Sequence, residues 1–362
     1  MSARGTSAPF GGLHTVTPKH IFLFVLCFAI AASLLHSRSY NALPSQIHTW
    51  VQSDHYALSL GFLGNEFNFF KPETFALSHE FPAESVLENP RGITSTDFPA
   101  FQFVVAAAMS ALGTTEPWVF RLASLLMSFA ALLMLYVTIS KIKGVWVAAL
   151  LCGFIMFQPI YSFYQNGFHI SMASNSVFLV ACCFLLRSYH LLKPSYAVWA
   201  IVFFTLAALM RFTLVIFPLA LVCIYSIRFL RSRKIGAEFL AVLLGIALVV
   251  AYFLLNKNLA LEYGSIFLAK PIIAESIGAL ISHLVRIAAS YSRGLLPFLH
   301  LFVLGLLIYG FYKAPAENKQ KMQEWLLWLV FAVLGTTCFT LLMSWSIGAH
   351  DYYALDTWQP II

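Results

Sequence analysis

The sequence predicts an all-α protein that crosses a membrane several times, because of its composition and the spacing of its apolar runs. Of its 362 residues, 60% are hydrophobic and only 10% are charged, whereas about 25% of the residues of a soluble domain are charged. Apolar stretches of about 20 residues recur along the chain, and each is long enough to cross about 30 Å of hydrocarbon as a helix. Such continuous runs favour a helical bundle over a barrel.

About nine apolar runs are expected to form transmembrane helices. They lie at residues 20–36, 118–140, 144–163, 172–190, 195–211, 213–230, 237–256, 295–312 and 325–345. The six cysteines all fall inside apolar stretches without the spacing of metal ligands, so we interpret them as small core residues rather than as a disulfide framework.

The distribution of charge predicts the orientation of the chain. Short basic segments such as "SKIKG" and "RFLRSRK" fall on one side if the runs alternate, and with Arg4 and Lys19 they hold more than half of the 22 Lys and Arg residues. The positive-inside rule therefore places this side and the amino terminus in the cytoplasm. Because the basic residues lie in short loops between apolar runs, the net charge of +7 is explained by membrane orientation and does not require a nucleic-acid partner.

The same alternation places the longer loops outside. Residues 37–117 form the first outer loop and residues 257–294 the second, and all acidic residues except Glu238, Glu317 and Glu324 lie on this side. Residues 1–19 are expected to be a disordered cytoplasmic terminus, followed by one transmembrane domain over residues 20–362. No cleavage pattern follows the first run, so it is interpreted as a retained anchor.

The apolar segment 98–113 is shorter than the other runs. We expect a helix at the membrane interface that ends at Gly113, because a full crossing would place "KIKG" outside. A genuine extra crossing is the alternative.

Two acidic residues of the first outer loop are candidates for chemistry. Asp54 follows Trp50 near the start of an expected amphipathic helix rich in aromatic residues, although a solvated loop carboxylate is the simpler interpretation. Asp97 precedes Phe98 and Pro99, where it can cap the helix that follows, serve a site, or do both.

The order of several motifs resembles one family. "WVQSDHYALSLGFLGNEFNFFKP", "STDFPAFQFVVAAAMSALGTTEPWVFRLASLL" and "HDYY" are similar to elements of GT-C glycosyltransferases of the protein mannosyltransferase and aminoarabinose transferase type. The resemblance extends from about residue 20 to the end, and it is specific in order and topology rather than in any single motif. It implies a GT-C-like arrangement of spans with interfacial helices in the first outer loop.

The resemblance also implies a reaction. Such enzymes transfer a sugar from a polyprenyl-phosphate carrier to a glycan, lipid or protein acceptor on the outer face of the membrane, here expected to be a bacterial inner membrane. Asp54 corresponds to the first-loop acid of the family and would act as general base, with Asp97 as the second catalytic acid. The donor carries no nucleotide, so a glycine-rich phosphate loop is not required, and the sequence contains none.

Basic residues near the outer face are candidates for binding the donor's phosphate. Arg211 lies between two apolar runs with almost no loop, where a charge is costly unless it is paired or hydrated. Its simpler interpretation is an arginine that snorkels to the interface. The second outer loop adds four further candidates, which are Lys257, Lys270, Arg286 and Arg293.

Two further groups complete the expected binding site. The "HDYY" element supplies His350, Tyr352 and Tyr353, which the resemblance places near the lipid phosphate, although they also fit an aromatic belt. Gln165 and Asn166 lie in the turn after the third run, where related enzymes often carry an aspartate. This departure weakens the expectation of a divalent metal such as Mg²⁺ or Mn²⁺, which would fall to Asp54 and Asp97.

Two other function classes remain open. A transporter or flippase should show hydropathy repeats and charges near span centres, and a non-catalytic membrane scaffold would need no acid among aromatic residues. In the family a further span would begin where "DYYALDTWQPII" ends, so we expect a chain truncated at its carboxy terminus.

Overall fold

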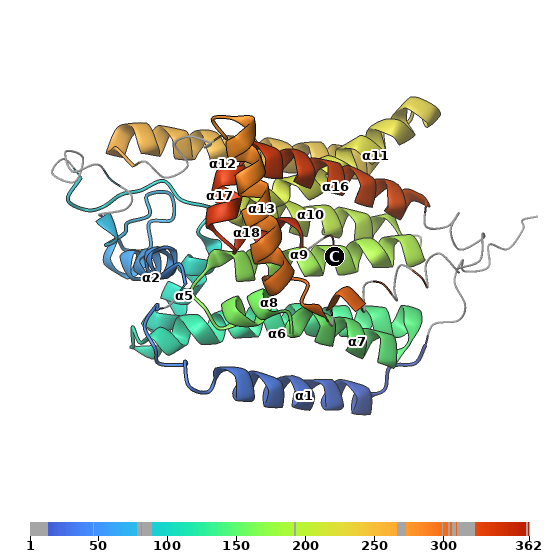
Figure 1. Cartoon of the computed structure of the whole chain (residues 1–362), viewed down its shortest axis with the longest axis horizontal. Coiled ribbons are helices and arrows are strands. Elements are labelled where there is room, and N and C mark those ends of the chain that lie inside the picture. The colour runs from blue at the N-terminus through green and yellow to red at the C-terminus, as the bar shows by residue number, and fades with distance from the viewer. Residues whose placement is uncertain are drawn as a thin grey trace, which may run out of the picture.

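The computed structural model shows an α-helical protein (Figure 1). It describes residues 14–45, 47–77, 81, 89–191, 193–265, 273–298, 300–302, 305, 309, 323–359 and 361. Within these ranges no β-strand occurs, and the one bridge outside named strands pairs Glu73 with Ile93.

Six helices of the described residues are long and apolar enough to cross a membrane. Four of them are α1 (Pro18–His36), α6 (Pro117–Lys143), α9 (Ile170–Leu191) and α12 (Ala237–Tyr263). The fifth is the segment Phe212–Ser232, which consists of η1 (Phe212–Val215) and α11 (Ile216–Ser232). The sixth is residues Trp325–Leu342 of α16 (Gln323–Leu342). A bent pair of shorter helices adds a seventh if it forms one span. The chain is an integral membrane protein.

The run at 144–163 is not one straight helix. It divides into α7 (Val145–Met156) and α8 (Pro159–Gln165), which are bent by 76° relative to each other. Pro159 begins α8, a position where its missing N–H group costs no helical hydrogen bond. A proline at this point therefore ends one helix and starts the next.

Two other expected spans are not seen as full crossings in the residues that the structure describes. The run at 195–211 forms α10 (Pro194–Met210), whose 17 residues reach about 25 Å at 1.5 Å per residue. Half of the run at 295–312 falls outside the described residues. The structure therefore supports six to seven spans by length and composition, against about nine expected from hydropathy.

The interfacial segment forms α5 (Ala100–Leu112), which ends at Gly113 in the left-handed conformation, as expected for a glycine that closes a helix. Its 13 residues reach about 20 Å, short of the roughly 30 Å that a crossing needs, so the alternative of a full crossing is wrong. Pro99 occupies the N-cap position of α5, and no side chain caps it. The proposed capping role of Asp97 is therefore also wrong.

Helix α9 lies at the centre of the bundle, with 72% of its apolar window buried. It packs against α6 and α10, and α6 also packs against α7. By contrast, only 11% of the corresponding window of α1 is buried, so most of this helix faces away from the protein. In a membrane protein, such apolar exposed faces are suited to contact with lipid.

Shorter helices gather around one end of the bundle (Figure 1). Helix α2 (Thr49–Gly64) packs on α5 there, while α13 (Ile277–Gly294) runs across the direction of the longer helices and packs on α17 (Ser344–Ala349). Helix α18 (Tyr353–Thr357) packs against α9 and η1. Segments from both ends of the sequence therefore meet at this end.

Candidate functional site

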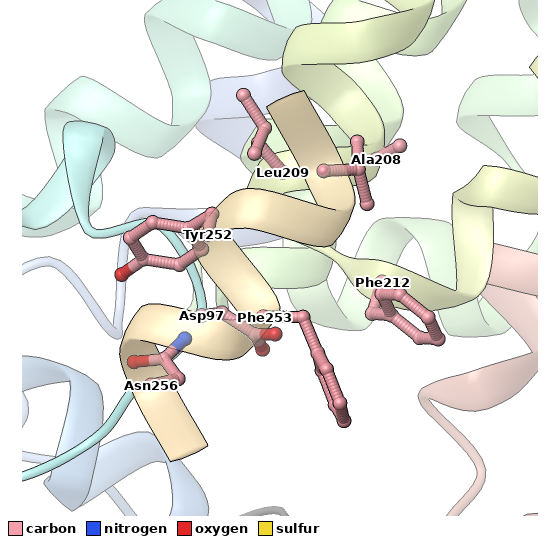
Figure 2. Close-up of a pocket in the computed structure, with 8 residues that line it drawn as sticks. Asp97, Ala208, Leu209, Phe212, Tyr252, Phe253 and Asn256 are labelled. Carbon is pink, nitrogen blue, oxygen red and sulfur yellow. The ribbon is translucent and has the colours of Figure 1, made fainter. Parts of the chain in front are cut away.

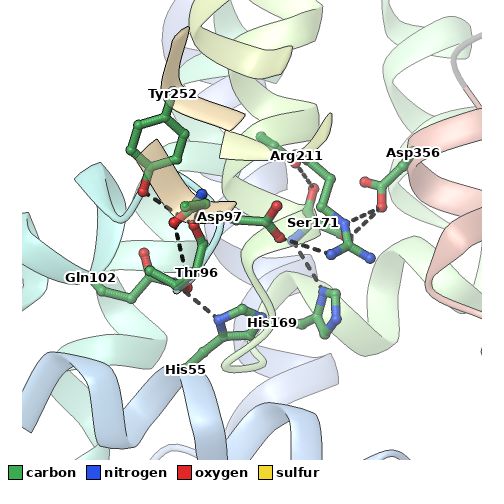
Figure 3. A network of polar contacts seen from close by, with 11 residues as sticks. His55, Thr96, Asp97, Gln102, His169, Ser171, Arg211, Tyr252 and Asp356 are labelled. Atoms are coloured by element: carbon green, nitrogen blue, oxygen red, sulfur yellow. Dashed lines mark hydrogen bonds and ion pairs between the residues drawn. The ribbon is translucent and has the colours of Figure 1, made fainter. Parts of the chain in front are cut away.

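Arg211 is the centre of the candidate site (Figure 3). Its guanidinium donates from Nη1 to Asp97 Oδ2 at 3.0 Å and from Nε to Asp356 Oδ2 at 2.8 Å. The arginine and both carboxylates are buried. A buried cation is tolerated when it is paired and hydrogen-bonded, which is what these two contacts provide.

The backbone explains why an arginine is found at this position. Helix α10 ends at Met210, and Arg211 has extended backbone angles of φ −151° and ψ 103° before η1 begins. The chain therefore breaks its helix within an otherwise apolar region. The break allows a short, buried connection to carry a charged side chain into the bundle.

Each carboxylate is held by its own segment. Asp356 lies in α18 and also accepts a hydrogen bond from Ser171 Oγ at 2.7 Å. Next to Asp97, the backbone of Thr96 exchanges two hydrogen bonds with the Asn256 side chain, and Phe98 N donates to the carbonyl of Leu209 at 3.0 Å. Five distant parts of the chain thus position one ion-pair cluster.

The aromatic pair of the "HDYY" element covers the guanidinium. The Cζ atom of Arg211 lies 5.2 Å from the ring centroid of Tyr352 and 5.1 Å from that of Tyr353, within the range of cation–π contacts. The ring of His350 stacks on Tyr352 with centroids 5.3 Å apart. The structure therefore brings together five of the candidates chosen from sequence: Asp97, Arg211, His350, Tyr352 and Tyr353.

A pocket of about 250 Å³, partly open to the surroundings, lies on the other side of Asp97 (Figure 2). Apolar side chains of α10, η1 and α12 form most of its wall, and Tyr252 and Asn256 of α12 supply polar atoms. Its lining is Asp97, Ala208, Leu209, Phe212, Val249, Tyr252, Phe253 and Asn256. The Asp97 carboxylate thus lies between this pocket and Arg211.

Asp54 is placed differently from the other acids. It lies in α2, its side chain is buried, and its Oδ1 atom has no hydrogen-bond partner among the described residues. Burial raises the pKa of this carboxyl to about 7. The structure therefore shows a carboxyl group outside the Arg211 ion pairs whose charge changes near neutral pH.

Two buried histidines near the cluster were not among the sequence candidates. His55 Nδ1 lies 3.0 Å from Gln102 Nε2, and His169 Nδ1 accepts from Ser171 N at 3.1 Å. Their rings meet edge to face with centroids 5.1 Å apart, and both Nε2 atoms lack a partner within the described chain. Burial lowers the pKa of His55 to about 3, with the nearby Arg211 charge as a second cause, so its ring is neutral.

The remaining sequence candidates lie elsewhere. Gln165 contacts His36 Nε2 at 3.2 Å and donates to Ser128 Oγ at 2.7 Å, and Asn166 donates to Ser39 Oγ at 2.9 Å. These contacts join α8 to α1 and α6 rather than to Arg211. On α13, Arg286 and Arg293 are exposed. Lys270 falls outside the described residues.

The described residues contain no group of three or more His, Cys, Asp or Glu side chains arranged to hold a metal ion. Asp97 contacts Arg211 through Oδ2. A divalent cation held by Asp54 and Asp97 alone stays a prediction.

The fold is similar to solved structures of ArnT from Cupriavidus metallidurans. The apo structure matches with a TM-score of 0.60 at 15% identity, covering 94% of this chain and 58% of that chain. The structure bound to undecaprenyl phosphate matches with a TM-score of 0.61 at 13% identity, covering 96% and 60%. The protein therefore shares the membrane fold of these structures and spans about 60% of the length of ArnT.

Neither a family model nor a curated protein matches the sequence. At these levels of identity, the likeness to ArnT concerns the fold, and the chemistry has to be argued from the side chains.

Proposed function

We propose that this protein is a GT-C-type glycosyltransferase that moves a sugar from a polyprenyl-phosphate donor to an acceptor hydroxyl at the outer face of the membrane. The observation that supports this most is the fold, which matches ArnT in a structure with undecaprenyl phosphate bound. The acceptor is a glycan, a lipid or a protein, and the membrane is a bacterial inner membrane with the amino terminus in the cytoplasm.

Arg211 is the group that binds the donor's phosphate. Its Nη2 atom is buried and has no hydrogen-bond partner among the described residues, while Nε and Nη1 are held by the two carboxylates. The two ion pairs fix the guanidinium plane, so that the unused N–H groups are oriented before the substrate arrives. A preorganised cation of this kind stabilises the negative charge that develops on a departing phosphate.

Asp54 is the general base. A pKa raised to about 7 by burial leaves a useful fraction of the carboxylate ionised at neutral pH and makes it basic enough to accept a proton. In the reaction, the acceptor oxygen bonds to the anomeric carbon as its proton moves to Asp54. The bond between that carbon and the phosphate oxygen breaks, and polyprenyl phosphate leaves with the electron pair.

A transfer assay with purified protein tests this function. A radiolabelled polyprenyl-phosphate sugar is incubated with candidate acceptors, and the wild type is compared with Asp54→Asn, which keeps the shape of the side chain but removes the base. We expect a loss of roughly 10²-fold or more in kcat, typical of a removed general base.

The matched control is Glu262→Gln, which makes the same chemical change at an exposed position on α12. The control should keep wild-type turnover. Equal turnover in wild type and Asp54→Asn would remove Asp54 from the mechanism, whereas no transfer from any polyprenyl-phosphate sugar by the wild type would refute the function.

A further inference from the structure

A second network of hydrogen-bonded polar side chains includes His48, which lies just before α2. His48 is one of few non-glycine residues with a positive φ, at φ 54° and ψ 38°, which is the left-handed region. A non-glycine residue in this conformation is strained, so the surrounding contacts must hold it. Such strain is found most often where a side chain has a specific task.

The imidazole of His48 is bound by a carboxylate. Its Nε2 atom lies 3.2 Å from Asp351 Oδ1, and the same oxygen accepts a hydrogen bond from Tyr164 OH at 2.7 Å. Burial alone would raise the pKa of Asp351, but these hydrogen bonds outweigh it and lower that pKa. Because the carboxylate is ionised and has no hydrogen to donate, His48 carries a hydrogen on Nε2.

The other nitrogen of His48 faces a second imidazole. His48 Nδ1 and His350 Nδ1 are 3.5 Å apart, the outer limit of a hydrogen bond. Of two such nitrogens, one must carry a hydrogen for the contact to be attractive. The four residues Tyr164, Asp351, His48 and His350 therefore form one continuous chain, in which a hydrogen can lie on either histidine.

At its His350 end, this row of residues meets partly exposed aromatic side chains. Trp50 and Trp345 meet the ring of His350 with centroids 5.6 Å and 6.2 Å away, and their exposed fractions are 41% and 40%. His350 also stacks on Tyr352, the ring that lies over Arg211. A single aromatic ring thus separates this histidine from the guanidinium proposed to bind phosphate.

The charges around the two histidines favour one arrangement of protons. His48 faces Asp351, the rings of His350 and Tyr352, and more distantly His169. Burial, the His48 ring and the Arg211 charge lower the pKa of His350 to about 4, whereas Asp351 opposes the shift. His350 is therefore neutral near pH 7. A positive charge on His48, by contrast, is compensated by the Asp351 carboxylate that contacts its Nε2 atom.

We propose that His48 and His350, positioned by Asp351 and Tyr164, form a proton relay that protonates the departing phosphate of the donor. This inference rests on the proposed transferase function and adds a general acid opposite Asp54. His350 is the residue that meets the phosphate, while His48 supplies the proton and Asp351 orients His48.

The proton balance of this step is complete. Charged His48 passes its Nδ1 proton to His350 Nδ1 as His350 Nε2–H is transferred to the phosphate oxygen that has lost its bond to the sugar. The acceptor's proton goes to Asp54 and then to water. The relay resets when His350 Nε2 takes a proton from water on the outer side and the Nδ1 proton of His350 returns to His48 Nδ1.

The test is the pH dependence of transfer in His350→Gln, His48→Gln and Asp351→Asn, each compared with wild type. The relay predicts a loss of roughly 10²-fold in kcat with little change in KM, because general acids act on the transition state. It also predicts that the wild-type rate falls at high pH and that this fall disappears in His48→Gln. The control is His14→Gln, an exposed histidine remote from the site, which should keep both rate and profile.

Asp351→Asn and Tyr164→Phe separate a loss of activity from a folding defect, because both substitutions retain the size and shape of the side chain. Each is expected to elute as wild type in size-exclusion chromatography, with Tyr164→Phe losing less activity than Asp351→Asn. A wild-type rate and an unchanged high-pH limb in His350→Gln and His48→Gln would overturn the relay while the transferase function stood. Absence of transfer by the wild type would instead overturn the function.

Discussion

Arg211 shows how one residue can join a whole site. Its guanidinium compensates two buried carboxylates, from residues 114 and 145 positions away in the sequence. Removing one member of a buried ion-pair network typically costs about 3–5 kcal/mol, because the remaining charges stay buried without a partner. The same side chain is proposed to bind phosphate, so its loss should affect both stability and turnover.

We therefore expect Arg211→Ala to lower the unfolding temperature strongly and to abolish transfer. Arg211→Lys should recover part of the stability but little of the activity, since an ammonium cannot hold two carboxylates and a phosphate in the fixed geometry of a guanidinium. Thermal unfolding in detergent and the transfer assay measure the two effects. Arg231→Ala, at an exposed position in the last turn of α11, is the control and should change neither.

The raised pKa of Asp54 gives a prediction about pH. Burial disfavours the ionised form in the folded protein, so the carboxyl contributes stability below its unfolded pKa of about 4 that is lost as the pH rises through about 7. Asp54→Asn removes this cost of ionisation. The unfolding temperature of Asp54→Asn should therefore rise relative to that of wild type as the pH increases from 5 to 8. A difference that stays constant with pH would contradict the buried, unpaired carboxyl.

Some of these residues could be found from sequence and others could not. Arg211 was recognisable because a charge between two apolar runs is unusual, and Tyr352 and Tyr353 because they follow a span. Asp356, His48 and His169 gave no comparable signal, since their partners lie in distant segments and no local pattern encodes such pairs. The strained backbone at His48 is likewise imposed by tertiary contacts.

At the scale of the helices, hydropathy located the segments but not their shape. Apolar windows predicted one span at 144–163, yet Pro159 divides it into α7 and α8 at an angle of 76°. The short α10 arises from the break at Arg211, which a sliding window averages away. The end of α5 at Gly113 was in contrast readable from local chemistry, because glycine readily adopts the left-handed conformation.

Close packing between α10 and α12 provides a test of the bundle. A Cβ atom placed on Gly245 of α12 would lie 2.2 Å from Thr205 Oγ1 of α10, so even alanine must push the helices apart. Overpacking of this kind costs about 1–3 kcal/mol. Gly245→Ala should therefore lower the unfolding temperature, whereas Gly153→Ala on α7, where nothing lies within 4 Å, should leave it unchanged or raise it slightly. Equal effects would mean that α10 and α12 are not in this contact.

At the scale of the whole molecule, the distribution of basic residues predicts which side faces the cytoplasm. A cysteine at Lys234, after α11, should react with a membrane-impermeant thiol reagent only after permeabilisation. A cysteine at Glu262, near the end of α12, should react in intact cells, since both positions are exposed. The experiment starts from a variant in which the six native cysteines are replaced. Labelling in the opposite pattern would reverse the orientation and place the candidate site on the cytoplasmic side.

The ion pairs of Arg211 also have a consequence for the order of biosynthesis. The ribosome makes Asp97 first, then Arg211, and adds Asp356 only 145 residues later. During that interval the guanidinium is paired with Asp97 alone, and α18, which packs on α9, has not been made. In a nascent chain the Nε–H group of Arg211 thus lacks its carboxylate acceptor until almost the last described segment emerges.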